Sequence, residues 1–167
     1  FLWLVQDGVT NGAIYALLAL ALLLVFAVTR VIFVPQGEFI TFAALSLSLL
    51  EAGRMPGTVY ILAVGGLVAA AIAGFSALRE RAWRRLPRIA GLYIVLPVAV
   101  ALLVAWAAPR KFDQWVQVLL VLAMVVPLGP IVYRIAYQPL ASASVLGLFI
   151  VSRAVHYVLT GLSLVFF

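Results

Sequence analysis

The stretch Arg30-Val-Ile-Phe-Val-Pro-Gln-Gly-Glu-Phe39 separates two apolar segments that each have the composition of a membrane helix. Pro35 lacks a backbone donor and Gly37 relaxes the backbone, so a helix is predicted to break here. In lipid, a broken helix is tolerated only where protein or a water-filled cavity covers its backbone. Because transporters use such breaks to direct half-helix ends and polar groups at a substrate, we expect this break to line a solute pathway.

Composition places the chain in a membrane. Its 167 residues are 67% hydrophobic, with a mean hydropathy of +1.26. Soluble domains contain about 45–50% apolar residues, so an integral membrane protein is indicated. The absence of cysteine excludes disulfides and thiolate metal sites, and a single histidine, His156, excludes a cluster of histidine ligands. We expect no cofactor, and we expect 1–167 to be one transmembrane domain, the N-terminal part of a longer chain.

The positive charges indicate how the chain is oriented. Of the eleven basic residues, five fall in Arg79–Arg88, between apolar runs. This placement is typical of a cytoplasmic loop and not of a surface that binds nucleic acid. Counting crossings outward from this loop places the N-terminus outside and Arg134 in the cytoplasm. Arg110 and Lys111 then fall outside, but two charges weigh less than five.

The apolar runs predict an all-α, polytopic transmembrane bundle with about six membrane segments, of which the second is discontinuous. The predicted segments are Gly8–Thr29, Phe39–Leu50, Val59–Leu78, Gly91–Ala107, Trp115–Val132 and Val145–Phe167. The second is too short for a full crossing, so we expect a half-helix whose free N–H groups and positive dipole end face the break. We further expect a kink at Pro97, a bend or end near Pro127 and Pro130, and a polar connection over Arg134–Ser144.

Glu38 is the most informative acid, because burying a carboxylate in a membrane costs energy unless it is paired or hydrated. Two interpretations stay open. Glu38 is either a pathway residue that meets a substrate amine or fixes the break, or a helix-start acid stabilised by the dipole. Gln36 offers a neutral donor and acceptor beside the same helix start. It either helps to bind a carboxylate or caps the helix. With Gly37, these residues form the predicted pathway site.

Two further polar pairs lie within apolar runs. Asn11 and Tyr15 are one turn apart, so they either face the pathway or satisfy a neighbouring backbone. Thr10 or Asn11 is also a candidate cap for the first helix. Arg153 and His156 are three residues apart and share a face, which makes them a candidate intramembrane polar pair. The alternatives are an Arg153 that extends to the interface and a His156 that is hydrogen-bonded in the core.

Signals of an enzyme are weak. The five acidic residues form no spaced pair, and no Gly-x-x-x-x-Gly-Lys-Ser/Thr loop for ATP occurs. We therefore expect no catalytic residues and no metal site. If the protein transports actively, the energy comes from a partner subunit or from an ion gradient.

Two blocks of sequence resemble a known family. The first comprises Asn11-Gly-Ala-Ile-Tyr-Ala-Leu-Leu-Ala-Leu20, Val25-Phe26, Arg30-Val-Ile and Gln36-Gly-Glu-Phe39; the second comprises Tyr133-Arg-Ile-Ala-Tyr-Gln-Pro-Leu140 followed by Ser144-Val-Leu. In this order they resemble branched-chain amino acid ABC transporter permeases of the LivH type. The chain departs from that pattern at Gln36 and Gln138, where the family has His and Arg, and Arg81–Val132 resembles a two-helix insertion.

This resemblance implies a multi-pass permease subunit of an ABC importer in the bacterial inner membrane. It implies a second permease subunit, two cytoplasmic ATP-binding subunits that hydrolyse ATP, and an extracytoplasmic solute-binding protein as partners. The implied solutes are branched-chain or other small amino acids, or related amides, moved by alternating access. The residues alone leave two alternatives: an ion-coupled secondary transporter, and a non-transporting membrane subunit or intramembrane enzyme.

Overall fold

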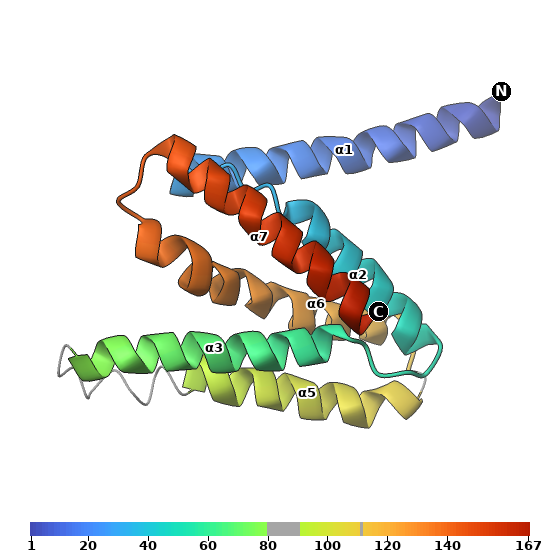
Figure 1. Cartoon of the computed structure of the whole chain (residues 1–167). Coiled ribbons are helices and arrows are strands. Elements are labelled where there is room, and N and C mark those ends of the chain that lie inside the picture. Colours follow the sequence, from blue (N-terminus) through green and yellow to red (C-terminus); the bar gives the residue numbers. More distant parts are fainter. Residues whose placement is uncertain (80–90, 111) are drawn as a thin grey trace.

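The protein is all-helical in the computed structural model, which describes residues 1–79, 91–110 and 112–167 (Figure 1). The α-helices are α1 Leu2–Thr29, α2 Gln36–Glu51, α3 Thr58–Arg79, α5 Leu96–Ala107, α6 Gln114–Val132 and α7 Val145–Phe166. Short π and 3-10 turns extend them: η2 Gly91–Val95, η3 Ala108–Arg110, η4 Tyr133–Tyr137 and η5 Gln138–Leu140. In the described residues, five helical segments are long and apolar enough to cross a membrane. The predicted polytopic helical bundle is therefore confirmed.

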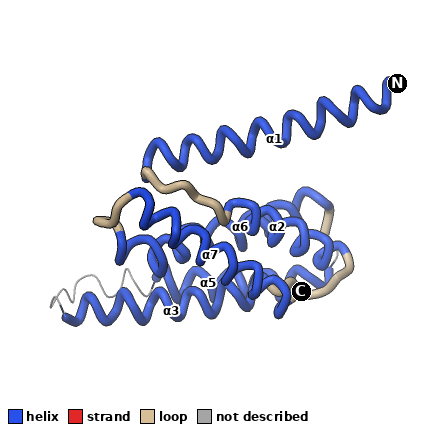
Figure 2. The backbone as a smooth tube through the Cα atoms, turned by 45° about the horizontal axis from the view of Figure 1, so that its top comes forward, coloured by secondary structure: helices blue, strands red, loops and turns tan. Residues whose placement is uncertain are grey.

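Helix α6 lies at the centre of the bundle, where it contacts α2, α3 and α5 (Figure 2). Its buried residues recur at spacings of three and four, which is the pattern of a helix face packed on a core. They are Gln117, Leu120, Val121, Met124, Leu128 and Ile131. A buried hydrogen bond joins α2 to α3, where Ser46 Oγ and Thr58 Oγ1 lie 2.6 Å apart. Such hydroxyl pairs help to hold membrane helices together, because lipid is as apolar as the helix surfaces and apolar burial gives little driving force for association.

Helix α1 stands apart from the bundle, and none of its residues is buried (Figures 1 and 2). It begins at Leu2, earlier than the predicted Gly8, because nothing in the first residues stops a helix. Thr10 and Asn11 therefore lie inside it, where Thr10 Oγ1 donates to Gln6 O at 2.9 Å and Asn11 Nδ2 to Asp7 Oδ1 at 3.2 Å. The prediction that one of them caps the helix is wrong.

The second crossing is discontinuous, as predicted. Helix α1 ends at Thr29 and is capped by Arg30, whose φ of 56° is left-handed and whose N–H donates to Phe26 O at 2.8 Å. The chain then runs without regular helix until α2 begins at Gln36. With 16 residues, α2 is about 24 Å long, short of the roughly 30 Å of hydrocarbon in a bilayer. Helix α2 is accordingly not among the five helical segments long and apolar enough to cross a membrane in the described residues.

Prolines act differently in the two later crossings. Pro97 has no N–H to bond Tyr93 O, and the chain before it forms the π-helix η2, whereas the kink at Pro97 stays a prediction. Pro127 and Pro130 lie inside α6, which continues past both. The helix extends through η4 and η5 to Leu140. The predicted polar connection Arg134–Ser144 is therefore wrong over its first half.

The ends of the helices fall on two sides of the bundle. The end of α3 and the start of α7 lie at the left of Figure 1, and the loops after α2 and α5 lie at the right. Arg79 ends α3 and Arg134 bonds Ser76 near the same helix end, whereas Arg110 ends η3 after α5; which side is cytoplasmic stays a prediction. Most of the basic stretch Arg79–Arg88, and Lys111, lie outside the described residues.

Gly66 allows α3 to approach the η2–α5 segment closely. A Cβ added at Gly66 would lie 2.5 Å from Tyr93 O and 2.9 Å from Pro97 Cγ, whereas at Gly74, two turns further along α3, nothing lies within 4 Å. We expect Gly66→Ala to destabilise the protein by about 1–3 kcal/mol through overpacking. Gly74→Ala is the matched control, and we expect it to be neutral or stabilising because alanine favours helix. Denaturant titration in micelles measures both, and equal stabilities would contradict the close contact.

Candidate solute-pathway site

Glu38 lies in the first turn of α2 and joins it to α7 within the membrane span. Thr160 Oγ1 donates to Glu38 Oε1 at 3.2 Å. Thr160 is fifteen residues after Val145, about 22 Å into α7, so this contact is remote from the α7 start. The Glu38 side chain is only 12% exposed. A carboxylate is therefore held at the point where the broken helix restarts.

His156 is the second partner of Glu38. Its Nδ1 lies 3.2 Å from Glu38 Oε1, but it is not aligned for a hydrogen bond and has no other partner. The imidazole is 32% exposed, one turn before Thr160 on the same face of α7. The contact is an ion pair only when the ring is protonated. Glu38, His156 and Thr160 form what we call the polar cluster.

Local structure explains why Glu38 is stable at this position. Its own N–H donates to Pro35 O at 3.0 Å, which forms the turn that starts α2. The N–H groups of a first helical turn and the helix dipole both favour a negative charge. Thr160 Oγ1 also lies 2.9 Å from His156 O, so its single hydrogen is shared between this carbonyl and the Glu38 carboxylate. Glu38 therefore combines the role of a helix-start acid with contacts to a second helix.

Arg153 and His156, predicted as a possible pair, contact different residues. Arg153 is exposed, and its Nη2 donates to Tyr157 Oη at 3.2 Å, with the guanidinium carbon 5.6 Å from the ring centroid. His156 faces Glu38 instead. Arg153, His156, Tyr157 and Thr160 nevertheless occupy about 100° of the helix circumference, which we call the polar stripe of α7. Since exposed charge within a span is costly in lipid, this stripe requires water or protein beside it.

The break itself is covered by protein. Val31 and Pro35 are buried, and the Phe33 ring lies 5.6 Å from that of Phe39 and 5.9 Å from that of Tyr137. Tyr137 is anchored in turn by a 2.7 Å hydrogen bond between its hydroxyl and that of Ser152 on α7. The aromatic contacts thus provide the cover that a broken membrane helix needs.

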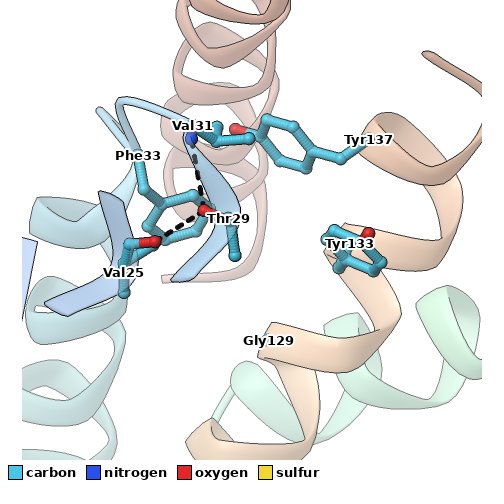
Figure 3. Close-up of a pocket in the computed structure, with 7 residues that line it drawn as sticks. All are labelled: Val25, Thr29, Val31, Phe33, Gly129, Tyr133 and Tyr137. Carbon is cyan, nitrogen blue, oxygen red and sulfur yellow. Dashed lines mark hydrogen bonds between the residues drawn. The ribbon is translucent and has the colours of Figure 1, made fainter. Parts of the chain in front are cut away.

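A pocket of about 200 Å³ lies beside the break (Figure 3). It is lined by Val25, Thr29, Val31, Phe33, Gly129, Tyr133 and Tyr137. Thr29 lines it too. The Thr29 hydroxyl donates to Val25 O at 2.7 Å and accepts from Val31 N at 3.2 Å. Ligand pockets usually measure about 300–1,000 Å³, and Glu38 does not line this one. The pocket is therefore not by itself the solute site.

The other predicted site residues divide into two groups. Gln36 and Gly37 adjoin Glu38 at the start of α2, where Gln36 is half-buried and Gly37 exposed. No hydrogen bond of the Gln36 side chain occurs within the described part of the chain. Asn11 and Tyr15 are exposed on α1, which projects away from the bundle, so the structure does not bring them to Glu38.

Sequence reasoning missed Thr160 and the pairing of Glu38 with α7. Thr160 and Glu38 are 122 residues apart, and no local pattern connects them. The available signal was the spacing of His156 and Thr160, which places both on one face. In the described residues, no group of three or more His, Cys, Asp or Glu could hold a metal. The polar cluster suits a proton or a cationic amine.

Comparison with protein-family models, curated proteins and solved structures gives no match to this chain. Fold and site alone therefore define the class: a multi-pass helical membrane protein with a polar cluster where a helix is broken.

A double-mutant cycle tests whether Glu38 and His156 interact. We expect Glu38→Gln and His156→Gln to be non-additive in unfolding free energy, by about 0.5–3 kcal/mol, because each removes the other's nearest polar partner. Denaturant titration of the purified protein in micelles gives the four stabilities. The control cycle combines His156→Gln with Glu51→Gln, an exposed acid at the far end of α2, and should be additive. Additivity in both cycles would show that Glu38 and His156 are energetically independent.

Proposed function

We propose that this chain is a permease subunit of an ABC importer for branched-chain or other small amino acids, or related amides. One observation carries the proposal: Glu38, at the restart of a broken membrane helix, is held against the polar stripe of α7. Ionisable groups inside a membrane mark substrate or ion pathways, and broken helices recur at transporter binding sites. A purely structural role would not require the polar stripe to be exposed beside the acid.

The polar stripe supports a pathway shared with a second subunit. Arg153 and Tyr157 are exposed within α7, where contact with lipid would be costly. A second permease subunit facing this stripe would enclose it and leave room for water and solute. Alternating access would then open this enclosure to each side in turn, with the break of one subunit lining it.

The charges of the stripe suit an amino acid. A zwitterion presents an ammonium and a carboxylate together. Glu38 suits the ammonium, and Arg153, which begins the stripe seven residues before Thr160, offers planar donors for a carboxylate. The choice of branched-chain solutes rests on the family resemblance, not on this geometry. The same resemblance supports two ATP-binding subunits, an extracytoplasmic binding protein and the bacterial inner membrane.

An ion-coupled transporter is the second candidate, and the contact between Glu38 and His156 favours it. A carboxylate beside an imidazole is an arrangement that proton relays in transporters use. The two candidates differ in their energy source. In proteoliposomes, uptake that requires ATP and the ATP-binding subunits supports the importer, and uptake driven by a proton gradient alone supports the rival.

Replacement of Glu38 tests the site. We expect Glu38→Ala to reduce solute uptake by membrane vesicles to background, because the pathway loses its acid, while the protein still inserts and assembles. Glu51→Ala removes an exposed acid from the same helix and should leave uptake unchanged. Uptake at the unmutated level in Glu38→Ala would remove Glu38 from the mechanism and favour a non-transporting subunit.

A further inference from the structure

A second feature of the molecule is an apolar groove of about 550 Å³ between α3 and α7, with α6 and η4 as its floor. Its walls include Gly65 and Val68 of α3 and Val158 of α7, and its floor includes Ile131 and Ile135. Val68 is 42% exposed and Val158 is 61% exposed, so the groove is open along the side of the bundle. No ionisable or hydrogen-bonding side chain lines it. It is separate from the polar cluster, which lies on another face of α7.

The α3 wall of this groove continues to a basic end. Ser76 follows Gly65 by eleven residues, and Arg79 follows Val68 by the same interval, so each pair shares a face of the helix. Arg134, next to the groove residue Ile135, reaches this end and donates from Nη2 to Ser76 Oγ at 3.3 Å. The groove therefore leads along α3 to two arginines on one side of the bundle.

The Arg134 guanidinium is incompletely bonded. Nη1 donates to Gln138 Oε1 at 2.5 Å, but Nε is buried and has no hydrogen-bond partner. Within the described residues, no carboxylate lies within 4 Å of it. Arg79 adds a second positive charge and begins the basic stretch Arg79–Arg88 of the sequence. Guanidinium groups bind phosphate oxygens with paired donors, so this end of the groove is suited to a phosphate.

We propose that an anionic phospholipid binds here, with its phosphate at Arg134 and Arg79 and one acyl chain in the groove. Eleven residues of helix span about 16 Å, close to half of the roughly 30 Å hydrocarbon thickness, which is the depth of one acyl chain. The basic end lies on the side predicted to be cytoplasmic, where basic pockets between helices recognise anionic headgroups. An extended polypeptide would find no partners for its backbone in the apolar groove.

Native mass spectrometry of the full chain in micelles tests this, with phosphatidylglycerol and phosphatidylcholine as probes. We expect phosphatidylglycerol to be retained, and Arg134→Gln to weaken it about tenfold or more, with phosphatidylcholine unchanged. Arg134→Lys should retain part of the affinity. Arg110→Gln, on the opposite side, is the matched control and should change nothing. Inorganic phosphate should not compete, because the groove holds the acyl chain.

A groove variant keeps the proposal falsifiable if Arg134→Gln does not fold. Val68→Trp fills the groove at an exposed position and should displace phosphatidylglycerol while the arginines stay in place. Equal retention of both lipids, or phosphatidylglycerol binding unaffected by Val68→Trp, would overturn the proposal. So would a change of oligomeric state in Val68→Trp without loss of lipid, because a second copy would then be the occupant.

Discussion

Every backbone polar group in hydrocarbon must find a partner within the protein, and this constraint governs the region from Thr29 to Glu38. Short local bonds meet it in part: Arg30 N–H to Phe26 O, Val31 N–H to the Thr29 hydroxyl, and Glu38 N–H to Pro35 O. The rings of Phe33, Phe39 and Tyr137 cover the segment. Helix α2 begins directly after this segment and carries Glu38 in its first turn, so the position of the site depends on these bonds and rings.

Much of the fold is readable from the sequence because apolar runs of membrane length admit few alternatives. The break at Pro35 was predictable because a proline falls between two such runs, but Gly37, also predicted to break the helix, lies inside α2. The errors have a common cause. Of the bend or end predicted near Pro127 and Pro130, the end is excluded, because surrounding helices stabilise a segment that local propensity disfavours. The start of α1 and the extension of α6 to Leu140 likewise depend on how far helix continues into polar sequence, where local signals are weakest.

The site was less predictable than the fold. Glu38 was identifiable from sequence, since an isolated acid beside a break in an apolar chain is costly and therefore informative. Its partners were not, because periodicity shows which residues share a helix face but not which neighbouring helix that face meets. His156 and Arg153 lie about 60° apart on α7, and that difference sends one side chain toward α2 and leaves the other exposed. Only the packing of α7 on α2 decides between them.

Helix α7 separates the two functional surfaces proposed for this molecule: a polar one toward α2 and an apolar one toward α3. On the polar side, a single hydroxyl group, that of Thr160, makes the hydrogen bond between the two helices at Glu38. The same hydroxyl also bonds its own helix at His156 O. This polar link is therefore one shared hydrogen bond, about 0.5–1.5 kcal/mol, beside the apolar packing of Phe42 in one cluster with Leu159 and against Phe167. Breaking it would leave the backbone hydrogen bonds of both helices in place, because Thr160 and Glu38 meet through side-chain atoms alone.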